Sequence, residues 1–241
     1  MKKDSDVLRV NGGFPIEIYA DGPNINQIKG LASVVTGYTF NPTLFKNLGV
    51  KNYLEFCKEL VEVCKFPISL EVFADDKNGM VSQAKKLSSL SELVYVKIPI
   101  SYTNGNSTKD VIDILVSENI KLNITAVFTM AQIQNIIKVA SKSEIIISIF
   151  SGRIFDIGYD AVSYTKKLAD FIHQESNCKV LWASPRMVYD LVNACNASCD
   201  IITMNPSLIK KIDIFEKTLE EYSLDTVKMF FNDASSSGYL L

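Results

Sequence analysis

The chain has 241 residues, of which 47% are hydrophobic and 22% charged, and its formal net charge is −2. This composition excludes a disordered chain, and the absence of a strongly basic stretch argues against nucleic acid or an anionic membrane as the main partner. Residues 1–13 lack an apolar segment and no window approaches a membrane span, so we expect neither a signal peptide nor a membrane anchor.

Eight short apolar runs alternate with amphipathic stretches along the chain. Most of the runs are nearly continuous in Ile and Val, which is typical of parallel strands covered on both faces. They predict strands at 16–20, 32–35, 68–73, 93–100, 120–128, 144–150, 179–183 and 200–204.

Helical periodicity fills the segments between these runs. It predicts helices at 51–64, 80–90, 111–115, 130–139, 159–173 and 185–195. Eight β-α units indicate an α/β protein, a (β/α)8 TIM barrel, within a single domain over 1–241. We expect its core at about 16–212 and an extra C-terminal helix in a tail at about 213–241. A doubly wound open sheet is the alternative, although no glycine-rich nucleotide-binding loop follows any strand.

Cysteine and histidine usage limits the chemistry. The five cysteines include no CxxC pair, which predicts reduced, mostly buried thiols in a cytoplasmic protein. The single histidine, His173, lies in an amphipathic stretch where we expect a solvated helix position. These features argue against a Ser-His-Asp arrangement and against a histidine metal site, so proton transfer falls to carboxylates, lysine, tyrosine or water.

Lys97 is the most unusual residue, because it interrupts the apolar run LVYVKIPI. Burying an unpaired ammonium is costly and favours loss of its proton, which yields an amine able to form a Schiff base with a carbonyl. The alternative is a lysine that reaches solvent at the strand end or pairs with a carboxylate.

Other polar residues follow the predicted strands, where a barrel builds its active site. Asp21 ends the first strand, either as an acid-base group or as a cap for a helix at 24–32. Glu71 breaks an apolar run, either as a catalytic acid or as the partner of a buried cation. Arg153 and Arg186 follow the sixth and seventh strands, and are either phosphate ligands, with Ser184 at the start of a helix, or members of surface salt bridges.

Six stretches in order resemble the transaldolase family, in its short branch that also contains the fructose-6-phosphate aldolases. They are IYAD (18–21), GYTFNPT (37–43), VKIP (96–99), NITAVFTMAQ (123–132), SIFSGRI (148–154) and LWASPR (181–186). Six ordered matches are far more specific than any one of them.

The resemblance implies a barrel with a Schiff-base lysine on its fourth strand, here Lys97. It implies that Asp21 moves protons during C–C cleavage and that Glu71 and Thr125 hold the catalytic water. It also implies substrate and phosphate contacts from Thr39, Asn41, Asn123, Ser148, Phe150, Arg153, Ser184 and Arg186. No metal or organic cofactor is implied, since the imine is the electron sink. The implied partners are sugar phosphates of carbohydrate metabolism, such as those of the pentose phosphate pathway, and further copies of this chain.

Two positions bear on the reaction within that branch. Glu71 stands where the aldolases tend to have glutamine, and Phe150 where they tend to have tyrosine, and both favour transaldolase. The alternatives are an aldolase that releases dihydroxyacetone and a non-catalytic barrel that binds sugar phosphates. The chain departs from the family pattern at Phe40, at Pro185 and in the C-terminal segment from residue 223, which leaves the acceptor open.

Overall fold

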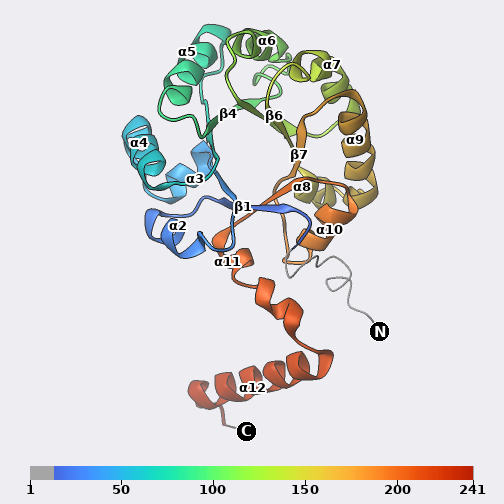
Figure 1. The fold of residues 1–241 in the computed structure, drawn as a ribbon. Helices are drawn as coiled ribbons and strands as arrows, with labels where there is room; N and C mark the ends of the chain where they lie inside the picture. The colour runs from blue at the N-terminus through green and yellow to red at the C-terminus, as the bar shows by residue number, and fades with distance from the viewer. Residues whose placement is uncertain (1–13, 241) are drawn as a thin grey trace. The chain divides into compact units, whose positions relative to one another are not determined.

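A computed structural model describes residues 14–240 and shows eight parallel strands closed into a barrel (Figure 1). Each strand pairs with the next in sequence, and the last pairs with the first. The closed order confirms the (β/α)8 barrel and excludes the open sheet. Residues 1–13, for which no signal peptide was expected, lie outside the described residues. The strands are β1 (Glu17–Asp21), β2 (Gly37–Thr39), β3 (Ile68–Glu71), β4 (Val94–Pro99), β5 (Leu122–Val127), β6 (Ile145–Ile149), β7 (Lys179–Trp182) and β8 (Ile201–Met204).

Helices follow the strands and surround the barrel, as Figure 1 shows. Their buried faces are lined by aliphatic residues at helical spacing, as the periodicity predicts. They are α2 (Ile25–Leu31), α3 (Pro42–Asn47), α4 (Tyr53–Val63), α5 (Lys77–Ser88), α6 (Lys109–Ser117), α7 (Met130–Ala140), α8 (Ser151–Asp156), α9 (Ala161–Glu175), α10 (Asp190–Asn196) and α11 (Pro206–Ile209).

The chain divides between Ile209 and Lys210 into the barrel unit and a C-terminal unit. The C-terminal unit holds a 3-10 helix (Ile212–Glu216) and α12 (Leu219–Ser237), which bears out the predicted helix in the tail. A capping box between Thr218 and Glu221 starts α12, and Gly238 ends it in a left-handed conformation. Within residues 14–240, no helix is both long and apolar enough to cross a membrane.

Two predicted elements were wrong in position. The run at 32–35 is not a strand: Val34 and Val35 donate their backbone N–H groups to the Leu31 carbonyl and close the end of α2. The strand forms at 37–39 instead. The helix predicted at 185–195 begins only at Asp190, because the Asp190 carboxylate accepts the backbone N–H groups of Arg186 and Met187 and holds them in a turn.

A close approach inside the barrel explains a glycine in β2. A Cβ built on Gly37 would lie 2.5 Å from ring atoms of Tyr19, whose side chain is buried. The absence of a side chain at 37 therefore makes room for the Tyr19 ring, which packs with Ile146, Leu181 and Ile201 in the barrel interior.

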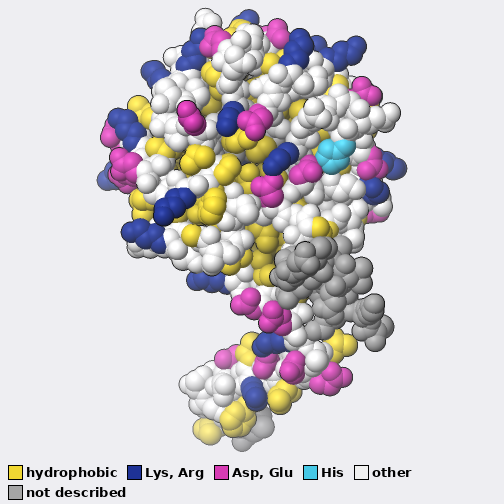
Figure 2. Space-filling view, viewed as in Figure 1, with side chains coloured by type: hydrophobic (Ala, Val, Ile, Leu, Met, Phe, Trp, Pro, Cys, Tyr) yellow, Lys and Arg dark blue, Asp and Glu magenta, His cyan; other side chains and the backbone are white. Residues whose placement is uncertain are grey.

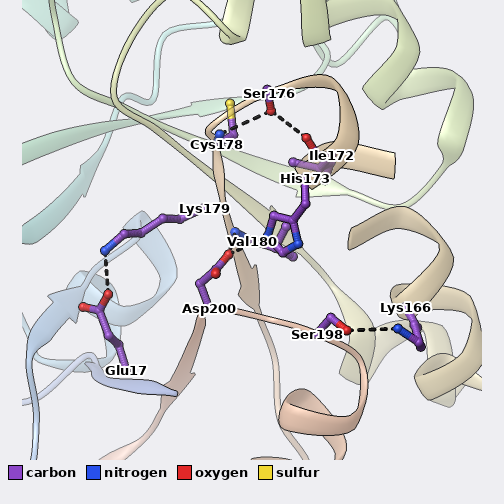
Figure 3. A network of polar contacts seen from close by, with 10 residues as sticks. All are labelled: Glu17, Lys166, Ile172, His173, Ser176, Cys178, Lys179, Val180, Ser198 and Asp200. Carbon is purple, nitrogen blue, oxygen red and sulfur yellow. Dashed lines mark hydrogen bonds and ion pairs between the residues drawn. The ribbon is translucent and has the colours of Figure 1, made fainter. Parts of the chain in front are cut away.

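Polar contacts join the elements at the amino-terminal ends of the strands. Lys179, the first residue of β7, donates to Glu17, the first residue of β1, at 2.5 Å (Figure 3). Asp200, just before β8, accepts from the Val180 backbone N–H at 2.7 Å and lies 2.8 Å from Nε2 of His173. Figure 2 shows acidic and basic side chains interspersed on the face that carries the histidine. His173 is thus a partly exposed residue of α9 that fastens α9 to the start of β8, and we assign this end of the barrel to stability.

All five cysteines are free thiols, and Cys57, Cys64, Cys178 and Cys199 are buried. The prediction that the thiols are mostly buried is confirmed.

Candidate active site

Strand register brings the predicted lysine and one predicted acid together at the carboxyl ends of the strands. Glu71 on β3 pairs with Lys97 on β4, so both side chains point into the barrel at one level. Nζ of Lys97 lies 3.2 Å from Oε2 of Glu71, and Lys97 is only 6% exposed. The Tyr53 hydroxyl donates to the Glu71 carbonyl at 2.5 Å and fixes the end of β3. Lys97 is therefore a buried amine held against a carboxylate, and it does not reach solvent.

Asp21 ends β1 on the other side of this amine. Thr39 donates its hydroxyl to Oδ1 of Asp21 at 2.7 Å, and the same hydroxyl contacts that of Thr203 on β8. Burial raises the pKa of Asp21, while the charge of Lys97 and the hydrogen bond from Thr39 lower it. Asp21 does not cap α2, since Asn24 forms the capping box with Gln27.

Two adjoining cavities open at this end of the barrel. The inner cavity, of about 60 Å³, is bordered by both Lys97 and Asp21. The outer cavity, of about 430 Å³, is more open to solvent and is bordered by Asp21 and Glu71. The two share six lining residues, so a ligand can reach the amine from outside. The shared residues are Asp21, Asn41, Thr125, Phe150, Arg153 and Ser184.

Thr125 presents a buried hydroxyl to both cavities. Its Oγ1 makes no hydrogen bond within the described residues, an arrangement that is costly unless a ligand or water supplies the partner. The next residue, Ala126, has a left-handed φ of 59° at a register irregularity in β5, which places Thr125 and Ala126 together on the wall of the outer cavity.

Three of the predicted amide and hydroxyl ligands, namely Asn123, Ser148 and Asn41, lie at different depths relative to the cavities. Asn123 is fully buried, accepts from Ser148 at 2.6 Å and donates to Ser69 at 3.0 Å. Ser148 lines the inner cavity. Asn123 lines neither cavity and positions Ser148 through their hydrogen bond. Asn41 caps α3 through Oδ1, which accepts from the Leu44 backbone N–H, and it lines both cavities.

One end of the cavities is basic and aromatic. The guanidinium of Arg153 lies 5.3 Å from the ring centroid of Phe150, which in turn packs against Phe128. Arg153 and Ser184 line both cavities. A Cβ built on Gly152 would lie 1.5 Å from the Ser184 carbonyl oxygen, so the glycine permits direct contact between the β6 and β7 loops. This contact fixes Ser184, which has a φ of 59°.

Arg186, like Asn123, is a predicted site residue that lines neither cavity. Its guanidinium binds the Asp156 carboxylate through two hydrogen bonds, with Nε 3.0 Å from Oδ1, and about half of each side chain is exposed. The helix expected to start after Ser184 begins later, and the N–H groups of Arg186 and Met187 are taken by Asp190. These two N–H groups are consequently not free donors to a ligand.

Sequence reasoning missed several residues of the site. Thr203 lines the inner cavity and Ala126 the outer one, while Ser69 and Asp156 hold predicted site residues. Thr203 and Ser69 carried a signal, since each is a hydroxyl residue within an apolar strand. Nothing in the local sequence points to Ala126, whose role comes from its backbone conformation.

The cavities at this end of the barrel thus bring together a buried amine, two carboxylates and an arginine. The model of the family described as Transaldolase/Fructose-6-phosphate aldolase matches residues 18–239. The chain belongs to this family.

Named relatives agree with this assignment, and a solved structure shares the fold. A protein from Kosmotoga olearia named "Probable transaldolase" is 32% identical over 90% of this chain and 95% of its own length. Another of the same name, from Thermoplasma volcanium, is 31% identical over 85% and 91%. The structure of a deoxyribose phosphate aldolase from Aeropyrum pernix shares the fold, with a TM-score of 0.56 at 11% identity, over 83% of this chain and 89% of that one.

We predict that Glu71→Gln lowers the free energy of unfolding by about 3 kcal/mol, because it removes the carboxylate that lies 3.2 Å from a buried amine. Urea titration at neutral pH measures this change. The matched control is Glu55→Gln, which removes the partner of Lys58 in an exposed pair and costs less than about 0.5 kcal/mol. Adding Lys97→Met to Glu71→Gln should restore most of the lost free energy of unfolding, because it removes the buried amine as well. Equal effects of the two glutamine variants would contradict this account.

Proposed function

We propose that this chain is a transaldolase that transfers a dihydroxyacetone unit between sugar phosphates through a Schiff base on Lys97. The main support for this proposal is the position of the Lys97 amine. It lies 3.2 Å from Glu71, on the wall of a cavity that Asp21 also lines. We treat the whole chain as one functional unit, since the family match spans the boundary at residue 209.

The proposed reaction begins when the neutral Lys97 amine attacks the C2 ketone of a ketose phosphate. The resulting carbinolamine hydroxyl takes a proton from Glu71, which has accepted it from the Lys97 ammonium, and leaves as water to give a protonated imine. Glu71 and the Thr125 hydroxyl, which border the same cavity, hold that water in this scheme. Asp21 then accepts the C4 hydroxyl proton as the C3–C4 bond breaks. The electron pair of that bond moves into the imine to form an enamine, and the fragment from C4 onward leaves as an aldose phosphate. The enamine attacks the aldehyde of the acceptor, and hydrolysis of the new imine frees Lys97.

The residues around the amine favour transfer over release. The carboxylate of Glu71 and the phenyl ring of Phe150 stand where the aldolases of the family tend to have glutamine and tyrosine. A missing hydroxyl at position 150 removes a group able to aid protonation of the enamine. We therefore favour a transaldolase over a dihydroxyacetone-releasing aldolase.

Borohydride trapping tests the mechanism. Incubation with fructose 6-phosphate and sodium borohydride should add the mass of the reduced adduct to the peptide that contains Lys97, and Lys97→Met should abolish the adduct. Lys121→Met is a matched control, because Lys121 pairs with Glu144 at the start of β5 and should leave trapping unchanged. Trapping elsewhere, or activity that persists in Lys97→Met, would overturn the mechanism.

Product analysis separates the candidate functions. With erythrose 4-phosphate present, a transaldolase forms a new ketose phosphate and no free dihydroxyacetone. Free dihydroxyacetone formed without an acceptor would indicate the aldolase. Substrate binding without a trapped adduct would indicate a non-catalytic barrel that binds sugar phosphates.

The proton-transfer role of Asp21 predicts a pH profile. As a base it must be ionised, so activity falls as the pH drops through its pKa, which burial holds above the ordinary value. Thr39→Val removes a hydrogen bond to the ionised form and should move the acidic limb of kcat upward by about one pH unit. Asp21→Asn should lower kcat by roughly 10²- to 10⁴-fold. An acidic limb that stays in place in Thr39→Val would contradict the role.

We also propose that the protein forms a homo-oligomer through α12. None of the α12 side chains is buried, and Leu224, Val227 and Phe231 share one face at spacings of three and four. Sedimentation velocity should show dissociation when Val227→Glu and Phe231→Glu are combined. The control Ser236→Glu, which adds charge without removing apolar area, should keep the assembly. A monomeric wild type, or an intact assembly in the double variant, would refute this proposal.

We place the reaction in the cytoplasm, in the metabolism of pentose and hexose phosphates. Support comes from the family and from the five free thiols, which fit a reducing compartment.

A further inference from the structure

The ion pair between Arg186 and Asp156 stands next to the basic end of the cavities. Asp156 ends α8, three residues after Arg153, which lines both cavities. Arg186 lies two residues after Ser184, which also lines both. The pair therefore joins α8 to the segment that follows β7, and its guanidinium binds a carboxylate instead of lining a cavity.

The fork geometry shows what this carboxylate occupies. Nε and Nη2 of Arg186 both donate to Asp156, one to each carboxylate oxygen. Two parallel N–H groups of a guanidinium are also the arrangement that binds a phosphate. Asp156 thus fills the same donors that an anionic ligand would need.

The backbone around Arg186 is held by buried contacts, whereas its side chain is partly exposed. The buried Asp190 accepts the Arg186 backbone N–H at 2.6 Å, and the Ser184 carbonyl is in contact with Gly152. The Arg186 side chain, by contrast, is 44% exposed. A change of partner at the guanidinium would leave these backbone contacts in place.

Electrostatics links Asp156 to both arginines. The hydrogen bonds from Arg186 are the main cause of the lowered pKa of Asp156, and the charges of Arg186 and Arg153 lower it further. Asp156 is therefore an anion at neutral pH within the field of the two cations. A phosphate carries more negative charge than one carboxylate and is able to compete for the same fork.

We propose that Asp156 is an internal competitor for the phosphate site: it holds Arg186 away from the cavities and releases it only to a phosphate bound at Arg153. This inference rests on the proposed function for its substrate class. It makes Asp156 a specificity-determining residue, since a ligand without a phosphate meets Arg153 alone and a phosphorylated one also recruits Arg186.

Calorimetric titration with inorganic phosphate at mildly alkaline pH tests the proposal without any need for catalysis. Asp156→Asn should tighten the phosphate Kd about fivefold, the scale of one exposed ion pair. The matched control is Asp170→Asn, which removes the same charge from an exposed pair with Lys166 on α9 and should leave the Kd unchanged. Adding Arg186→Gln to Asp156→Asn should abolish the gain.

Three results would overturn the proposal: a Kd in Asp156→Asn that is unchanged or weaker, a gain that persists in the double variant, or no phosphate binding by any variant. Weaker binding in Asp156→Asn would show that the carboxylate positions Arg186 instead of competing for it. Borohydride trapping of fructose 6-phosphate on Lys97 in the same variants distinguishes a failure of the proposed function from a failure of the Asp156 proposal. The expected phosphate responses without any trapped adduct would support Asp156 as a competitor and refute the proposed function.

Discussion

The buried contact between Lys97 and Glu71 governs the rest of the site. An ammonium deep in the barrel needs a counter-ion, and the register between β3 and β4 supplies one at 3.2 Å. The same carboxylate is a nearby acceptor for a proton of the amine. The sequence left two alternatives open, a neutral nucleophile or a paired lysine. The structure shows Lys97 paired with Glu71, and its action as a nucleophile is our proposal.

Buried polar side chains in this barrel are stabilised by hydrogen bonds to side chains on other strands. Thr39 links Asp21 to Thr203, and Asn123 links Ser69 to Ser148, so most buried hydroxyls and amides near the amine have partners. The hydroxyl of Thr125 is the exception at this level. In the inner cavity a water or substrate oxygen can therefore satisfy the Thr125 hydroxyl, beside the side chains of Lys97 and Arg153.

Features set by local pattern were predictable from the sequence, and features set by distant contacts were not. Continuous Ile and Val runs with one charged residue located β4 and Lys97, and polar strand ends located Asp21 and Glu71. The run at 32–35 failed because its apolar residues close a helix, and apolar character alone does not separate these cases. The late start of α10 and the capture of Arg186 depend on Asp190 and Asp156, whose carboxylates act through folded geometry. Phe40, which departs from the family pattern, is buried against Phe45 and lines neither cavity.

The relative size of the two cavities bears on whether the proposed dihydroxyacetone unit is transferred to an acceptor or released. The inner space beside Lys97 is small, whereas the outer space is several times larger and is reached past Phe150 and Arg153. In the proposed reaction, the fragment covalently held at Lys97 occupies the inner space and leaves the outer one for an acceptor. Release would require that water protonate the enamine, and the aromatic contact between Phe150 and Phe128 places apolar surface beside the amine's cavity. Under this proposal an acceptor whose phosphate engages Arg153 has the advantage over water, because a charged contact that water cannot make holds its aldehyde near the enamine.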